Sequence, residues 1–150
     1  MLEQRLEAEI KTALLARDSQ TATTLRTLKA ALLSYKVAEG KRDSGITDDE
    51  VIAIFSKEAK KRQESADLFR QGGNNEKAED ELAEKAIIET YLPAQLSEEE
   101  IGKTVDEVIA ATGANSAQDM GMVIGQVRGK LGAAADGSVI ARLVKGKLGV

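Results

Sequence analysis

Helical spacing is the feature that most limits how this chain can fold. Apolar residues recur three and four positions apart along nearly all of its 150 residues. No segment shows the every-second-residue alternation of a half-buried strand, and even the β-branched run Val51–Phe55 follows a capping box that marks a helix start. The sequence therefore predicts an all-α fold.

Seven helices are expected, and polar caps, glycines and one proline set their ends. The predicted helices cover about Leu2–Ala16, from Ser19 to about Ala38, from the Thr47 capping box to the Gly72 turn, and Glu76–Tyr91, followed by three that open at Ser97, at Ser116–Asp119 and at Asp136. The residues expected to face inward are Leu2, Leu6, Ile10, Ala13, Leu14, Leu25, Leu28, Leu32, Tyr35, Val51, Ile54, Phe55, Leu68, Phe69, Ile101, Val105, Val108, Ile109, Val139, Ile140, Leu143, Val144 and Leu148.

Pro93, the single proline of the chain, provides the strongest boundary signal. Proline disfavours helical geometry in the residue before it, so the fourth helix has to end ahead of Pro93. We therefore expect two domains, a four-helix N-terminal unit over residues 1–92 and a small three-helix C-terminal module over residues 93–150.

The sixth predicted helix carries Gly121, Gly125 and Gly129, one glycine every four residues and therefore on one face. Each interior glycine costs about 1 kcal/mol relative to alanine, which a helix tolerates only if another backbone comes close. The stripe therefore predicts either close packing on a second helix or close approach of an RNA backbone. It is no phosphate loop, because the Gly-x4-Gly-Lys pattern and a preceding strand are both missing.

Charge is unevenly distributed along a chain whose formal net charge is −4. Residues 116–150 carry five basic side chains against Asp119 and Asp136, and so form a basic tail on an acidic protein. The five candidate RNA-contacting residues are Arg128, Lys130, Arg142, Lys145 and Lys147. A solvated helix surface is the simpler interpretation of this tail, and phosphate contact without base reading is the functional one.

A second basic run, Lys57–Arg62, has an ordinary explanation. Glu58 and Arg62 stand four residues apart on one helix, as do Lys60 and Glu64, so surface ion pairing accounts for most of this run. A second RNA-contacting face remains the alternative for it.

The residue types that are missing restrict catalysis. Without histidine and cysteine the chain can form neither a Ser-His-Asp or Cys-His site nor an imidazole or thiolate zinc site. Acidic clusters such as Glu98–Glu100 stand in first helical turns, where the helix dipole favours them, so no catalytic residue, metal ligand or cofactor site is predicted. Aromatic residues make up only 3% of the chain, which argues against base-stacking platforms.

The start of the chain has mixed charge and lacks the apolar core of a signal peptide, and no apolar run is long enough to span a membrane. The expected location is therefore cytoplasmic.

Several short motifs are distributed along nearly the whole chain. In the N-terminal part they are Thr24–Ala30, the pattern Lys57-Glu-x-Lys-x-Arg-x-x-Ser65, Glu89–Pro93 and Gln95–Glu99. In the C-terminal part they are Asp119–Gly121, Gly125 and Ala135–Gly137. Together these motifs resemble the YqeY family. The C-terminal module is also similar to the tail domain of GatB, a component of glutamine-dependent tRNA amidotransferases, especially at Gly125–Val127 and Ala135–Asp136.

The resemblance implies a helical N-terminal domain joined to a tail-like module that is turned toward tRNA. It makes Pro93, Gly121, Gly125, Gly129, Asp136 and Gly137 structural positions. The favoured function is non-catalytic binding of tRNA or tRNA-related machinery, with neither DNA nor a membrane as partner. The alternatives are an accessory part of a carbon–nitrogen ligase that uses glutamine as amido-N-donor, with an amidotransferase or synthetase as partner, or a protein–protein adaptor.

Overall fold

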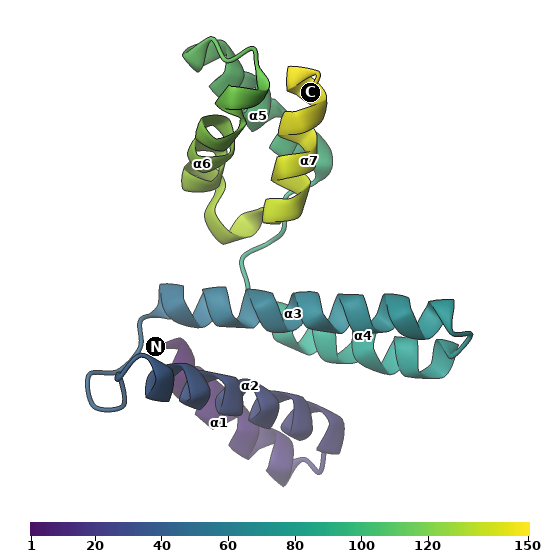
Figure 1. The fold of residues 1–150 in the computed structure, drawn as a ribbon. Helices are drawn as coiled ribbons and strands as arrows, with labels where there is room; N and C mark the ends of the chain where they lie inside the picture. Colours follow the sequence, from purple (N-terminus) through teal and green to yellow (C-terminus); the bar gives the residue numbers. More distant parts are fainter. The chain divides into compact units, whose positions relative to one another are not determined.

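The computed structural model describes residues 1–150 and confirms the all-α fold, with seven α-helices and no strand. The chain forms two compact units, Met1–Leu92 and Pro93–Val150. Unit 1 contains α1 (Leu2–Leu15), α2 (Ser19–Ala38), α3 (Asp48–Gln71) and α4 (Asn75–Glu89), and unit 2 contains α5 (Glu98–Thr112), α6 (Met120–Leu131) and α7 (Gly137–Leu148) (Figure 1). Short 3₁₀ turns at Ala117–Asp119 and Gly132–Ala134 flank α6.

Polar caps start the helices where the sequence predicts them. The Thr47 and Ser97 side chains each accept from the backbone N–H three residues on, and the glutamate at that position reaches back to complete a capping box. Asp136 accepts from the Ser138 N–H at 2.8 Å and caps α7 as expected. Each cap of this kind contributes about 1 kcal/mol.

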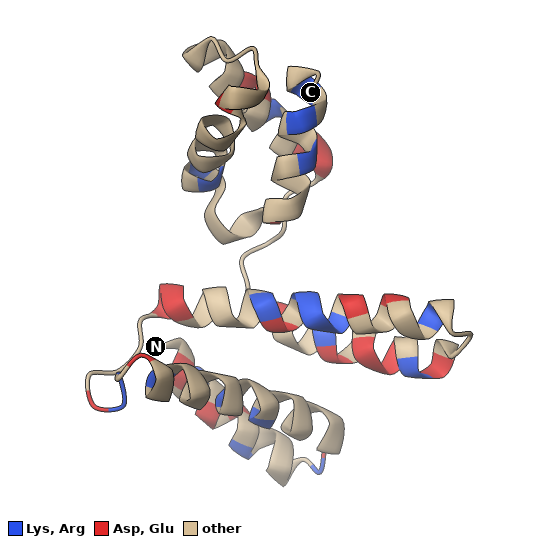
Figure 2. Cartoon of the chain, in the orientation of Figure 1, with Lys and Arg blue, Asp and Glu red and all other residues tan.

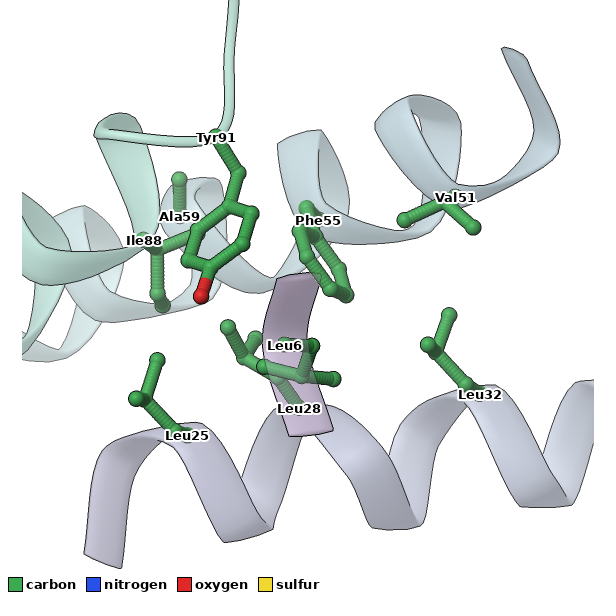
Figure 3. Close-up of a cluster of buried hydrophobic side chains, with 9 residues drawn as sticks. All are labelled: Leu6, Leu25, Leu28, Leu32, Val51, Phe55, Ala59, Ile88 and Tyr91. Carbon is green, nitrogen blue, oxygen red and sulfur yellow. The ribbon is translucent and has the colours of Figure 1, made fainter. Parts of the chain in front are cut away.

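The core of unit 1 is built mainly from α2 and α3, with contributions from α1 and the end of α4 (Figure 3). Its buried members are Leu6, Leu25, Leu28, Leu32, Val51, Phe55, Ala59, Ile88 and Tyr91. The rings of Phe55 and Tyr91 meet edge to face, with centroids 5.4 Å apart. Although α4 ends at Glu89 rather than at the predicted Tyr91, the turn after it still inserts the Tyr91 ring into the core.

Two leucines predicted to face inward do not. Leu14 is 49% exposed, because its neighbour Ala13 takes the inward position at the end of α1. Leu68 is 67% exposed, since it lies near the end of α3, and the buried residue of that stretch is Ala66. Both errors arise at helix ends, where the covering elements stop before the apolar pattern does.

Unit 2 has an entirely aliphatic core, because all four aromatic residues of the chain lie before Pro93. Its buried residues are Ile101, Val105, Val108, Ala114, Val123, Val127, Ala135, Ile140 and Val144. Near the start of the unit, the Leu96 N–H donates to the Ala134 carbonyl at 2.8 Å. Gly113 ends α5 with a φ of +71°, a conformation that glycine adopts without strain.

The glycine stripe does not pack on another helix, so that prediction is wrong. A Cβ built on Gly121, Gly125 or Gly129 would find no atom within 4 Å, and all three residues are exposed. The reason is geometric, since α6 is anchored by Val123 and Val127, and at 100° per residue the glycines fall on the opposite face. The stripe therefore leaves an open strip of helix backbone.

Candidate RNA interface

The five predicted cations lie on two helices of unit 2. Arg128 and Lys130 stand in the last turn of α6, while Arg142, Lys145 and Lys147 lie on α7. No acidic residue lies within α6 or α7, and Figure 2 shows both helices with basic bands only. Cations in a last turn also stabilise the helix dipole, by about 0.3–1 kcal/mol each, so part of this pattern is structural.

Arg142 and Lys147 are already paired within the unit. The guanidinium of Arg142 donates to the Glu98 carboxylate at the start of α5. The ammonium of Lys147 lies 2.8 Å from an Asp106 carboxylate oxygen, and its aliphatic stem passes Gly102, where an added Cβ would be 3.7 Å from the lysine Cε. These two cations are thus engaged with α5 through its own acidic side chains.

Arg128 has a different role, since its guanidinium lies against Gly137. A Cβ built on Gly137 would stand 2.7 Å from Nη2 of Arg128, so the guanidinium lies directly against the first residue of α7. A side chain at position 137 would therefore require the guanidinium to move. Arg128 therefore connects the end of α6 to the start of α7 and makes no ion pair.

Lys130 and Lys145 are exposed and make no ion pair. Together with Arg128 they are the cations of unit 2 that no carboxylate neutralises. Lys145 shares a face of α7 with Arg142, three residues earlier, but of these two only Arg142 meets a carboxylate of α5. The structure thus divides the predicted set into three unneutralised and two paired cations.

Half of the basic run of α3 is held in ion pairs: Lys61 and Arg62 are paired, whereas Lys57 and Lys60 are not, so the expected Lys60–Glu64 pair does not form. Arg62 is only 13% exposed and lies 3.0 Å from both Glu58 and Glu84. The Glu58–Arg62 pair follows the predicted spacing, but Glu84 belongs to α4 and no local pattern pointed to it. Lys61 also pairs with Glu58 at 3.0 Å. This cluster fastens α3 to α4.

A groove in unit 1 was not predicted. It has a volume of about 420 Å³, within the range of small-molecule sites. Its lining residues are Arg5, Glu9, Thr12, Ala13, Ala16, Asp18, Thr21, Leu25, Ile87 and Thr90. The lining comes from α1, the start of α2 and the end of α4, so a sequence pattern within one helix does not reveal it.

Arg5, Glu9 and Tyr91 form a closed network at this groove. The Tyr91 hydroxyl donates to Glu9, and the Arg5 guanidinium lies 4.3 Å from the centre of the Tyr91 ring and 2.9 Å from Glu9. Burial raises the pKa of Glu9, but the hydrogen bonds from Tyr91 and Arg5 outweigh it and leave the pKa lowered. Burial, and then the bond to Glu9, raise the pKa of Tyr91. A carboxylate held ionised in this way is a weak base at neutral pH, so the network stabilises structure.

No helix is long and apolar enough to cross a membrane. Fold and site together define a class, a two-unit helical protein whose second unit carries three exposed cations outside any ion pair. The sequence profile of the family described as Yqey-like protein matches residues 3–148. The chain belongs to the YqeY family.

Two fungal proteins are similar to it, and both are named Altered inheritance of mitochondria protein 41, mitochondrial. The protein from Eremothecium gossypii is 30% identical over 89 residues, which is 59% of this chain and 48% of that protein. The protein from Clavispora lusitaniae is 27% identical over 144 residues, which is 93% of this chain and 82% of that protein. The chain thus spans about half of the first relative's length and most of the second's.

Proposed function

We propose that unit 2 is an RNA-binding module and that its ligand is tRNA. The observation that carries the proposal is the set of exposed cations without a carboxylate partner, Arg128, Lys130 and Lys145. Such cations bind phosphates and displace counterions, which gives affinity without sequence reading. The resemblance of this unit to the GatB tail domain of the tRNA amidotransferases favours tRNA over other RNA.

The open glycine strip of α6 supports the same proposal. Nothing inside the chain compensates the helix propensity that its three glycines lose, since no atom approaches them. On the helical wheel Arg128 falls beside this strip, whereas Lys130 lies nearer the Val123 and Val127 side. A phosphate backbone can therefore come close to α6 next to Arg128.

Reversing the three unneutralised cations tests the proposal. The variant Arg128→Glu/Lys130→Glu/Lys145→Glu should abolish tRNA binding, which fluorescence anisotropy measures. For the wild type, a plot of the logarithm of the binding constant against the logarithm of the salt concentration should have a slope of roughly −3. The matched control is Lys11→Glu/Arg26→Glu/Lys57→Glu, which makes the same charge change at exposed, unpaired positions of unit 1. Equal loss in both variants, or unchanged binding in the first, would reject unit 2 as the interface.

The second candidate is a protein–protein adaptor, with an amidotransferase or a synthetase as partner. The same α6 face favours it, because Met122 is 44% exposed beside glycines that would admit a partner helix. Pull-down with purified amidotransferase components, with and without Gly125→Leu, distinguishes the candidates. An adaptor would lose its partner on this change and need no tRNA.

The chain alone is proposed to have no amidotransferase activity. Release of ammonia from glutamine requires an activated nucleophile, and histidine- and cysteine-based versions are excluded by composition. An ammonia assay on the purified chain with ATP and misacylated tRNA should give no turnover. Turnover that a single Ser or Lys substitution removes would instead favour a ligase role.

The compartment is part of the proposal as well. We place the protein in the cytoplasm, where tRNA is charged, and cell fractionation tests this against a mitochondrial location like that in the names of the two fungal relatives.

A further inference from the structure

We infer that Glu98 and Asp106 of α5 limit the RNA affinity of unit 2 by occupying Arg142 and Lys147. The inference rests on the proposed RNA binding and concerns its regulation. Each carboxylate is in direct contact with a basic side chain of α7, and a phosphate oxygen would have to displace it to form the same contact. The acidic face of α5 thus acts as a built-in competitor of RNA.

The two contacts have the geometry of a paired surface. Glu98 and Asp106 are eight residues apart on α5, slightly more than two turns, so they share one side of the helix. Their partners, Arg142 and Lys147, are five residues apart on α7, and both helices are fixed by a common core that includes Val105 and Val144. Gly102 lies between the two carboxylates and leaves room for the Lys147 stem, with the lysine Cε 3.7 Å from a built Cβ. The packing of α5 on α7 therefore holds both carboxylates near their cations.

The contacts are also easy to open. Glu98 and Arg142 are 61% and 58% exposed, and exposed ion pairs are weak because water and salt screen them. Glu98 lies in the first turn of α5 and Lys147 in the last turn of α7, where the helix dipoles favour their charges without a partner. RNA can displace both carboxylates at a small cost in free energy. A dense phosphate backbone can offset this cost, whereas an anion of lower charge cannot, so the competition favours RNA over weaker anions.

Removing the competitor should strengthen binding, which an ordinary damaging mutation does not do. Glu98→Gln/Asp106→Asn frees two cations, and the affinity for unfractionated tRNA should rise about threefold to tenfold. Because the freed side chains add phosphate contacts, the salt slope should steepen from roughly −3 to between about −4 and −5. Circular dichroism should show unchanged helix content.

The matched control is Glu99→Gln/Glu107→Gln. It removes the same charge from the same helix, but Glu99 faces Lys103 within α5 and Glu107 makes no ion pair, so no cation of α7 is released. An increase confined to the first variant, with the steeper slope, establishes the competition. An equal increase in both would show a general effect of net charge and overturn it.

The design also separates this inference from the proposed function. If the wild type binds tRNA and Glu98→Gln/Asp106→Asn binds it no more tightly, the inferred competition is wrong but the proposed RNA binding stands. If the wild type shows no binding and Glu98→Gln/Asp106→Asn binds, the carboxylates compete more strongly than inferred. If neither binds even at low salt, RNA binding by unit 2 is wrong and the inference falls with it.

Discussion

Replacing the three glycines of α6 by alanine is expected to stabilise unit 2. A helix-interior glycine is about 1 kcal/mol less favourable than alanine. Gly125 in the middle of α6 should return about that amount, and Gly121 and Gly129 near its ends roughly half each. Because no atom lies within 4 Å of the added Cβ positions, no steric term opposes the gain. The expected total is about 2 kcal/mol.

Native-state hydrogen exchange with peptide resolution measures this effect in the intact chain. A gain of about 2 kcal/mol should slow exchange in the core peptides of residues 93–150 about 30-fold, and leave residues 1–92 unchanged as an internal reference. The control Gly113→Ala should have the opposite sign, about 1 kcal/mol of destabilisation, because Gly113 has a φ of +71°.

Faster exchange in the triple-alanine variant would refute the reasoning, because it would mean that the glycine face packs within the chain. The triple-alanine variant also tests the proposed RNA binding. If the RNA backbone approaches α6, tRNA binding should weaken although the unit is more stable.

Three further predictions concern single residues. Arg62→Ala should lower the free energy of unfolding by about 2 kcal/mol in urea titrations, since it leaves the partly buried Glu84 unpaired and Glu58 with only the exposed Lys61 as partner. Asp136→Asn should be nearly neutral and Asp136→Ala should cost about 1 kcal/mol, because the side chain caps α7; equal losses would assign a role to the charge itself. The hydrogen bond from Lys41, and then that from the Thr47 backbone, lower the pKa of Glu50 from 4.5 to about 2. Its contribution to stability is therefore present above pH 4.5 and lost as the pH falls toward 2, and Glu50→Gln should flatten the pH dependence of the melting temperature in that window.

Local patterns predicted most of the fold, because helices and their caps are determined by neighbours in sequence. Periodicity located the helices, and Thr47, Ser97 and Asp136 marked three of their starts. Leu68 was misplaced because periodicity shows which residues share a face but not whether another helix covers that face.

The candidate interface was only partly predictable for the same reason. The sequence showed five cations close together along the chain. Two of them, Arg142 and Lys147, are neutralised by carboxylates of α5, more than thirty residues earlier, and ion pairs between helices have no local sequence pattern. The glycine stripe was recognised, yet its direction depends on Val123 and Val127 anchoring the opposite side of α6. The contact between the Arg128 guanidinium and Gly137 joins two helices, so no local pattern predicted it.

The late position of Tyr91 has a consequence for synthesis on the ribosome. Its hydroxyl meets Glu9 across 82 residues, and Ile88 beside it completes the core that α1 and α2 begin. Until the end of α4 leaves the exit tunnel, α1 and α3 cover the leucines of α2 only in part, and the nascent chain can present the rest to chaperones. Unit 2 draws its core from fewer than sixty consecutive residues, so it can close soon after its last helix emerges.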